Sequence, residues 1–439
     1  MVVKTVTCRA VTPIISRGLD YTKVRDYKVY SFELRPQSVK GVLHFWFRAV
    51  APRVIDVRNL NFEGVKDEEQ RKKLQKIYGT LEYKGLMYLE SLVFGSRECK
   101  APFGLSVEYK PSDVVEIGGV EDGKFKINNL EFDREILYAV YGTYYYTKKV
   151  EEMEKNFVEK CLKANATFEL KFYFKNEDVK EVIFSLLKLI SVLGGLGAKT
   201  TKGFGQFEIK SFDDEDGCFD RSNYVTKEKI LELLGSFEDS LKKYIEKFDE
   251  KKLLILSKSS NVEFPNLLDE SFEFSNPLVG SKRDWKEVMR ELYRQNGWYR
   301  QLKRELRFFK KQNQRQDVVR KLINCLEGKE KEVDIFPAVL GLPLQYQRLK
   351  SRIEKVTFFP YVPGEEEDRG RKPSPLRIII NKDSNGWTAY ALLLKSKITE
   401  EERLKYNIRA NFQAKLTITP DEVWKIFLSP KKNRGVPNQ

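Results

Sequence analysis

The sequence predicts an α+β protein with two domains, and three observations support that prediction. Residues 166–174 and 206–210 alternate apolar with polar side chains, as half-buried β-strands do. Between them, residues 179–193 place apolar side chains at helical three-and-four spacing, which predicts an amphipathic helix. The chain has 439 residues, of which 41% are hydrophobic, and this is enough to bury more than one core.

An acidic, turn-rich stretch marks the expected boundary between the two domains. Residues 211–217 read Ser-Phe-Asp-Asp-Glu-Asp-Gly, a composition that favours turns and loops. We therefore expect an N-terminal domain over residues 1–212 and a C-terminal domain over residues 213–439. Residues 364–373 predict an exposed loop, and residues 431–435 predict a frayed basic tail.

The N-terminal region predicts a strand followed by a helix with one basic face. Residues 5–10 alternate in polarity, and a helix is expected after Pro36, with Ser38 as its N-cap. Its basic side chains are four residues apart and form one cationic stripe, with Arg35 near the N-terminal end. The stripe consists of Lys40, His44 and Arg48. A solvated basic face would show the same pattern.

A glycine-rich loop connects the central helix to the strand that follows it. Residues 194–205 read Gly-Gly-Leu-Gly-Ala-Lys-Thr-Thr-Lys-Gly-Phe-Gly. Glycines permit positive φ and close backbone approach, while free N–H groups and two ammonium groups favour an anion. We therefore expect this loop to bind phosphate, although an ordinary glycine-rich turn is the alternative. The candidate residues are Gly194, Gly195, Gly197, Lys199, Thr200, Thr201, Lys202 and Gly203.

The glycine-rich loop departs from the familiar nucleotide-binding motifs. A Walker loop requires Gly directly before Lys, whereas Ala198 separates Gly197 from Lys199, and here the helix precedes the loop. A dinucleotide fingerprint requires a third glycine that is missing. Residues 202–205 match the opening of the RRM signature, but Gln206 stands where an aromatic residue is expected. Nucleotide hydrolysis is therefore disfavoured.

The charge of the chain favours a polyanionic partner. The formal net charge is +15, and residues 282–321 contain fourteen Lys or Arg against five acidic residues. Aromatic residues are interleaved with these charges, as binding of single-stranded nucleic acid would require. They are Trp285, Tyr293, Trp298, Tyr299, Phe308 and Phe309. The alternative is that these aromatics are the buried faces of helices whose other faces are solvated.

The sequence offers no pattern for a membrane span, a secretion signal or a metal site. It has no run of 18 apolar residues, and its first residues lack a signal-peptide core. The five cysteines are isolated from one another, so their spacing supports neither disulfides nor zinc binding. We expect a cytoplasmic protein with no cofactor and no metal.

Several motifs resemble those of the RAMP superfamily of CRISPR proteins, in the form found in the first subunit of type III-B (Cmr) effector complexes. Residues 31–49, Ser-Phe-Glu-Leu-Arg-Pro-Gln-Ser-Val-Lys-Gly-Val-Leu-His-Phe-Trp-Phe-Arg-Ala, resemble its N-terminal motif. Residues 12–14 resemble its opening motif, and residues 92–96 resemble its Phe-Gly-Ser element. The glycine-rich loop resembles the superfamily's signature loop. Residues 336–344 and 371–376 are similar to the subunit's C-terminal motifs.

The resemblance implies two ferredoxin-like (RRM-like) domains with helical insertions. It also implies a non-catalytic, RNA-binding subunit of a ribonucleoprotein in antiviral defence, which binds CRISPR RNA, target RNA and other Cmr subunits. The target sequence would then be recognised by base pairing with the guide RNA and not by this protein. Carried onto this chain, the RNA-facing residues are Arg35, Lys40, His44, Arg48 and the loop 194–205. Family members often carry arginine where His44 stands, which favours a cationic rather than a catalytic role for this residue. They often carry glycines where Ser16 and Arg17 stand.

Two other functions remain open. His44 is the only histidine and invites a role as general acid or base in a metal-independent endoribonuclease that processes CRISPR RNA. Such chemistry usually requires a second positioned group, and the sequence nominates none. A structural subunit whose basic surface meets only protein partners is the third candidate.

Overall fold

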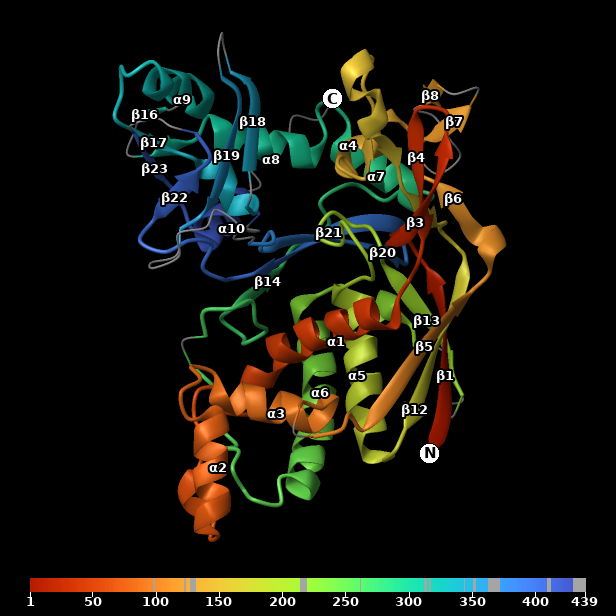
Figure 1. Ribbon diagram of the computed structural model, residues 1–439, viewed down its shortest axis with the longest axis vertical. Helices are drawn as coiled ribbons and strands as arrows, with labels where there is room; N and C mark the ends of the chain where they lie inside the picture. Colours follow the sequence, from red (N-terminus) through yellow and green to blue (C-terminus); the bar gives the residue numbers. More distant parts are fainter. Residues whose placement is uncertain are drawn as a thin grey trace.

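The computed structural model shows a mixed α+β protein with several β-sheets, which confirms the predicted α+β class (Figure 1). In Figure 1 the N-terminal sheet and its helices form the lower part, and most of the second half of the chain lies above it. The described residues are 1–97, 99–121, 124–126, 132–213, 219–260, 262–311, 314–315, 317–342, 344–349, 353–361, 372–408 and 412–428.

The N-terminal part is built on a four-stranded antiparallel sheet with strand order β13-β1-β12-β5. Its strands are β1 (Val2–Ala10), β5 (Phe103–Tyr109), β12 (Thr167–Phe174) and β13 (Phe207–Phe212). Helix α1 (Pro36–Val50) follows β1, and helix α5 (Asp178–Leu193) follows β12, which gives the chain order β-α-β-β-α-β. The two strands and the helix predicted around the glycine-rich loop are confirmed, with ends shifted by one or two residues.

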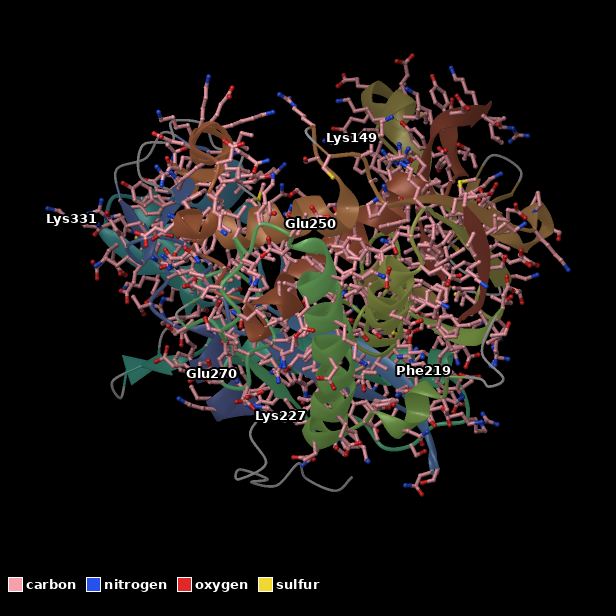
Figure 2. All side chains as sticks on the ribbon, turned by 90° about the horizontal axis from the view of Figure 1, so that it is seen from below. Lys149, Phe219, Lys227, Glu250, Glu270 and Lys331 are labelled. Atoms are coloured by element: carbon pink, nitrogen blue, oxygen red, sulfur yellow. The ribbon has the colours of Figure 1, made fainter. Side chains whose placement is uncertain are left out.

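The largest hydrophobic core lies between this sheet and helices α1 and α5. Alternate residues of β12 are buried, and the long helix α6 (Lys227–Phe248) packs against α5. Figure 2 shows α6 on the outside, running from Lys227 towards Glu250. Side chains from β20 and β21 also join this core, so it draws on both expected domains. The boundary between residues 212 and 213 stays a prediction, and most of the acidic stretch, residues 214–217, lies outside the described residues.

Helix α1 begins two residues before the predicted cap. Arg35 is its N-cap, without a side-chain hydrogen bond, and Pro36 is its first residue. Proline favours this position because its fixed φ suits a helix and its missing N–H would have no helical partner there. The amide of Ser38 donates to the carbonyl of Arg35 (2.9 Å), so Ser38 lies within the first turn. The prediction of Ser38 as N-cap is therefore wrong.

Among the described residues, the remaining N-terminal elements form three further sheets and three α-helices. The sheets have the orders β3-β4-β10-β9, β2-β11-β6 and β7-β8. Their strands are β2 (Ile14–Ile15), β3 (Arg17–Val24), β4 (Tyr27–Phe32), β6 (Val114–Glu116), β7 (Gly119–Glu121), β8 (Lys124–Lys126), β9 (Tyr144–Tyr145), β10 (Asn156–Val158) and β11 (Lys160–Leu162). The helices are α2 (Glu68–Tyr78), α3 (Lys84–Phe94) and α4 (Arg134–Ala139).

In the described part of the second half, three sheets and four α-helices follow α6. The sheets have the orders β14-β21-β20, β15-β16 and β17-β23-β22-β19-β18. Their strands are β14 (Phe272–Phe274), β15 (Lys310–Lys311), β16 (Gln314–Arg315), β17 (Glu332–Asp334), β18 (Leu344–Leu349), β19 (Ile353–Pro360), β20 (Leu376–Asp383), β21 (Gly386–Leu394), β22 (Arg403–Tyr406) and β23 (Gln413–Lys415). The helices are α7 (Trp285–Tyr293), α8 (Trp298–Arg307), α9 (Val318–Leu326) and α10 (Pro420–Phe427).

A second core fills the space around α8, α9 and the five-stranded sheet, and a third core joins the two halves. Phe132 and Phe204 from the first half meet α7 and β20 in this third core. In the described part of the chain, no helix is both long and apolar enough to cross a membrane. The predicted tail at 431–435 and most of the predicted loop, residues 364–371, lie outside the described residues.

Candidate nucleic-acid interface

The glycine-rich loop is fastened to the N-terminal strands by its own backbone. The amide of Ala198 donates to the carbonyl of Ile15 (2.7 Å), and the amide of Gly205 donates to the carbonyl of Pro13 (2.9 Å). Within the loop, the amide of Leu196 donates to the carbonyl of Gly205 (2.7 Å). These amides therefore hold the loop in place and do not point at a ligand.

A tight turn occupies the middle of the loop. The amides of Lys202 and Phe204 both donate to the carbonyl of Lys199, at 2.8 and 3.4 Å, and the amide of Gly203 donates to Thr200 (3.3 Å). The expectation of successive unpaired amides is therefore wrong at these positions. Any anion-binding capacity of the loop rests mainly on its side chains.

Close packing explains the glycines of this loop. A Cβ atom on Gly194 would lie 2.6 Å from Nε1 of Trp46, and one on Gly197 would lie 2.3 Å from the carbonyl of Ile15. Gly203 has φ +86°, a conformation that favours glycine, and it faces Ile380 of β20. Of the predicted contact residues, Gly194, Gly195 and Gly203 are buried.

The loop also joins the second half of the chain through Gln206. Its fully buried side chain donates from Nε2 to the carbonyl of Ile378 (3.0 Å) and accepts from the amide of Ile380 (2.7 Å). One side-chain amide thus pairs with β20 as a neighbouring strand would. The amide of Ile378 also donates to the carbonyl of Thr201 (3.1 Å). This pairing gives a structural reason for glutamine at the position where the RRM signature has an aromatic residue.

The two lysines of the loop point towards a basic region. The ammonium group of Lys199 donates to the carbonyl of Tyr141 (2.7 Å), and burial lowers its pKa. Burial lowers the pKa of Lys202 to about 7, and the nearby charges of Lys199 and Lys303 add to this effect. The ammonium group of Lys202 lies 5.9 Å from the ring centre of Tyr299.

Lys202 lines a cavity of about 650 Å³ between the loop, α4 and α8. We call it the tyrosine cavity because four tyrosines form much of its wall. Its lining residues are Arg134, Leu137, Tyr138, Tyr141, Tyr144, Tyr146, Lys202, Arg300 and Lys303. Three different segments of the chain therefore meet at this cavity.

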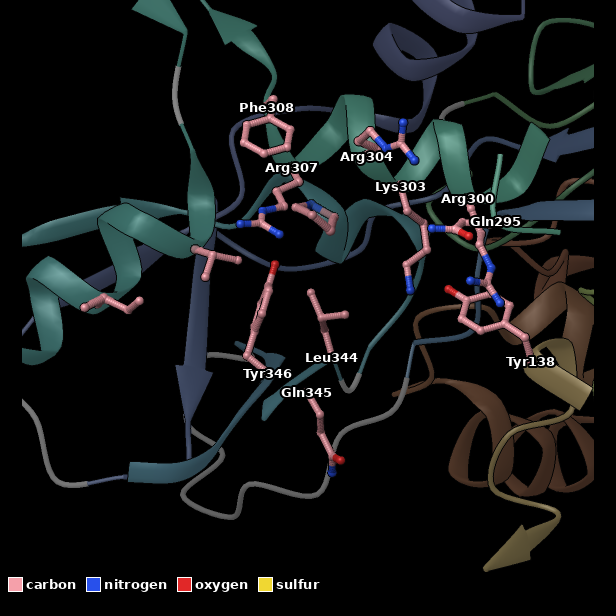
Figure 3. A pocket seen from close by; sticks show the side chains of 13 residues that line it. Tyr138, Gln295, Arg300, Lys303, Arg304, Arg307, Phe308, Leu344, Gln345 and Tyr346 are labelled. Carbon is pink, nitrogen blue, oxygen red and sulfur yellow. The ribbon is translucent and has the colours of Figure 1, made fainter. Parts of the chain in front are cut away.

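A second cavity of about 680 Å³ shares Tyr138, Arg300 and Lys303 with the tyrosine cavity (Figure 3). It extends beneath α8 towards β18 and α9. Its other lining residues are Gln295, Arg304, Arg307, Phe308, Val319, Ile323, Pro337, Leu344, Gln345 and Tyr346. We call the two cavities together the basic groove.

Helix α8 supplies most of the charge of the basic groove. Its cationic residues recur at three- and four-residue spacing, which places them on one face of a helix. Figure 3 shows Arg300 beside Tyr138 and Lys303 pointing away from α8. The groove is lined by six cationic side chains, and its described lining contains no Asp or Glu. The six are Arg134, Lys202, Arg300, Lys303, Arg304 and Arg307.

The partners of the groove residues leave much of this charge uncompensated. Arg307 pairs with Asp317 at 3.2 Å, outside the lining. The guanidinium group of Arg300 stacks on Tyr138 at 3.9 Å, and its Nε atom is buried without a hydrogen-bond partner in the described structure. The hydroxyl group of Tyr346 is likewise buried and unpartnered among the described residues. Cations, aromatic faces and unpaired polar atoms together suit a polyanion that carries bases.

The predicted stripe on α1 is partly neutralised by an acidic residue. Glu90 of α3 accepts a hydrogen bond from Nε of Arg48 (2.8 Å) and pairs with Nδ1 of His44. Burial raises the pKa of Glu90, but these two partners lower it, and its pKa lies below the ordinary value. His44 also stacks on Phe94, with ring centres 4.1 Å apart. This carboxylate gives His44 and Arg48 a partner inside the protein.

The other two residues predicted on this surface also contact the protein. Lys40 lies 5.0 Å from the ring centre of Phe103, and burial lowers its pKa. The Nε atom of Arg35 is buried without a hydrogen-bond partner in the described structure. None of the four predicted α1 residues lines the described basic groove, so the structure does not bring the two predicted sets together.

The basic segment 282–321 divides between the core and the basic groove. Trp285, Tyr293 and Tyr299 are buried, so the alternative reading of packed aromatic faces is right for these three. The cations of α8 and Phe308 line the groove. Sequence reasoning missed the tyrosines at 138–146, although five tyrosines in nine residues were a signal for them.

One family model matches the first part of the chain. Residues 7–208 match the family model of the RAMP superfamily. The matched residues include the motifs at 12–14, 31–49, 92–96 and 194–205 that resemble the same superfamily. A comparison with curated proteins found no match.

The solved structures that match the chain have low sequence identity to it. One is apo Cmr1 from Pyrococcus furiosus, with 16% sequence identity and a TM-score of 0.43, which covers 97% of this chain and 95% of that chain. Another is a chain of the type III-B Cmr-beta structure bound to cognate target RNA, with 17% identity and a TM-score of 0.43. That match covers 97% of this chain and 98% of the other. Among the described residues, no group of three or more His, Cys, Asp or Glu could hold a metal ion.

Proposed function

We propose that this protein is an RNA-binding subunit of a type III-B (Cmr) CRISPR effector complex and holds single-stranded RNA in the basic groove. The observation that carries the proposal is the groove itself, lined by six cations and several aromatic rings without a described acidic residue. The match to the RAMP family model and the Cmr-like sequence motifs support the choice of complex. The RNA partner is CRISPR RNA, target RNA or both, and the protein partners are other Cmr subunits.

The architecture proposed for this function is a pair of ferredoxin-like domains. The N-terminal chain order β-α-β-β-α-β and the strand order β13-β1-β12-β5 support it for residues 1–212. We propose a second domain of the same kind over residues 213–439. The basic groove then uses residues from both, because Lys202 and Tyr138 belong to the first domain and α8 to the second.

The groove gives the loop a specific part in binding. Lys202 lines the groove at its tyrosine end and Lys199 adds charge beside it, while the glycines let the loop pack closely against Ile15 and β20. Phosphates are bound by side chains of this groove, which position the strand without reading its sequence. Thr200, Thr201 and the α1 residues Arg35, Lys40, His44 and Arg48 stay candidate RNA contacts outside the described groove lining.

A charge-matched pair of double variants tests this function. Lys303→Ala with Arg304→Ala removes two groove cations, and we expect a tenfold or greater loss of affinity for single-stranded RNA. The slope of log affinity against log salt should also flatten by roughly 1.4, at about 0.7 for each lost phosphate contact. The control is Lys242→Ala with Lys243→Ala, which removes two exposed cations from helix α6. Equal loss of affinity in both variants would contradict binding in the groove.

The same RNA samples separate binding from cleavage. We propose that the isolated protein binds RNA without cutting it, so the RNA should shift on a native gel and stay intact on a denaturing gel, with or without EDTA. EDTA-resistant cleavage that is lost in His44→Ala would instead identify an endoribonuclease. Absence of any shift at low salt would favour a subunit that binds only proteins.

A further inference from the structure

The tyrosine cavity differs from the rest of the basic groove in the chemistry of its walls. Tyr138, Tyr141, Tyr144 and Tyr146 all line it. Tyr141 and Tyr146 are 58% and 43% exposed, which leaves part of their surface open to a ligand. Rings of this kind stack on nucleobases of any sequence, because every base has a π-face.

Cationic side chains also line the tyrosine cavity. Lys202, Arg300, Lys303 and Arg134 line it, and its described lining contains no carboxylate. Burial lowers the pKa of Lys202 most, and the charges of Lys199 and Lys303 lower it further, so both of these ammonium groups lie close enough to repel that of Lys202. An anion placed among them would relieve this repulsion. The unpartnered Nε atom of Arg300 is a further buried donor at the same place.

The cavity is large enough for one small ligand, since binding pockets typically enclose roughly 300–1,000 Å³. Its volume of about 650 Å³ lies within that range. A ligand that fits must place an anionic group near Lys202 and Lys303 and a flat aromatic group near the tyrosines. A nucleotide has both groups, at the two ends of one ribose.

We propose that the tyrosine cavity is a subsite for one unpaired nucleotide, with its phosphate against Lys202 and Lys303 and its base stacked on Tyr141 or Tyr146. The proposal deepens the proposed function and rests on it where the nucleotide belongs to an RNA strand. Base-paired nucleotides are excluded, because a base in a duplex does not expose its faces. The nucleotide can come from inside a strand, from a strand end or from a free mononucleotide.

Fluorescence of 2-aminopurine tests the subsite, because this base loses emission when it stacks. We would titrate the full-length protein into single-stranded 12-mers with the probe at an internal position or at either end. A further titration would use the free 5′-monophosphate of the probe nucleoside. At least one of these probes should be quenched by the wild-type protein but not by the double variant Tyr141→Ala with Tyr146→Ala. The probe that responds shows whether the bound nucleotide is internal, terminal or free.

Affinity measurements provide the second readout. The double tyrosine variant should bind single-stranded RNA about tenfold more weakly, as loss of one stacked base predicts. Its affinity for duplex RNA should not change. Tyr21→Ala is the control, since Tyr21 is an exposed tyrosine of β3 that does not line the described groove.

The outcomes distinguish the two proposals. If the double tyrosine variant binds and quenches as the wild-type protein does, while Lys303→Ala with Arg304→Ala weakens binding, the subsite is wrong and RNA binding in the groove stands. If no RNA 12-mer binds but the tyrosines quench the free monophosphate, the proposed subsite stands and the proposed RNA-binding function is wrong. If no arm shows quenching that depends on the tyrosines, the subsite is overturned.

Discussion

The fold places Lys202 where burial and neighbouring cations disfavour its charged form. It follows a turn that is fixed by hydrogen bonds to Lys199, and its side chain points into the tyrosine cavity beside other cations. Burial and the charges of Lys199 and Lys303 bring its pKa to about 7. A lysine with so low a pKa gains its charge most readily when an anion is near, which suits a phosphate-binding role.

The pKa of Lys202 predicts a pH-dependent effect on stability. The unfolded chain keeps this proton up to about pH 10.5, whereas the folded protein loses it near pH 7. The unfolded state therefore binds more protons between these values, and the contribution of Lys202 to stability rises with pH across this window. At pH 6, Lys202→Met should be roughly 2–4 kcal/mol more stable than the wild-type protein in the absence of RNA.

Denaturant unfolding at pH 6.0 and pH 9.5 measures this difference. The advantage of Lys202→Met should shrink at the higher pH, where the wild-type lysine is neutral in the folded state. A difference in unfolding free energy that is the same at both pH values would contradict the lowered pKa of Lys202.

The glycine-rich loop packs against both halves of the chain and connects them. Gly203 packs against Ile380 of β20, and Gln206 pairs with the backbone of the same strand. The loop therefore sets the position of Lys202 relative to α8. Its glycines serve this close approach, and its lysines reach the basic groove.

Substitution of Gly203 by Ala should destabilise the protein. A Cβ at this position would lie 3.2 Å from Cγ1 of Ile380, and the positive φ of +86° adds strain. We expect a loss of roughly 1–2 kcal/mol in the free energy of unfolding. Gly235→Ala is the matched control, because Gly235 lies within helix α6 and a Cβ there would meet nothing within 4 Å. Alanine in this helix should stabilise by up to about 1 kcal/mol. Destabilisation of both variants alike would contradict the account of Gly203.

The elements around the loop could be predicted from the sequence because their periodicity is local. The alternation in β12 and the helical spacing in α5 follow directly from which side chains face the core. The start of α1 could not be fixed in this way, because Pro36 favours the first helical position whereas Ser38 favours the N-cap, and the two preferences place the start at different residues. The use of the loop amides also escaped prediction, since their acceptors on Pro13 and Ile15 are distant in sequence.

At the scale of the whole molecule, the basic groove exists only because distant segments meet. Tyr138 and Arg134 come from α4, Lys202 from the loop, the other cations from α8 and Tyr346 from β18. The sequence identified the basic segment 282–321 and the loop separately, and it could not show that they face one another. It also gave no sign that Glu90 would pair with Arg48 and His44 on the other predicted surface.

Photo-cross-linking of 4-thiouridine RNA to the full-length protein, with the sites mapped by mass spectrometry, is the most direct test of RNA binding in the basic groove. The account predicts cross-links in residues 134–146 and 298–308, which carry the tyrosines and the basic face of α8. Cross-linking at these sites should fall when Lys303 and Arg304 are replaced by Ala. Cross-links confined to helix α1, around Lys40 and Arg48, would contradict the groove as the RNA site.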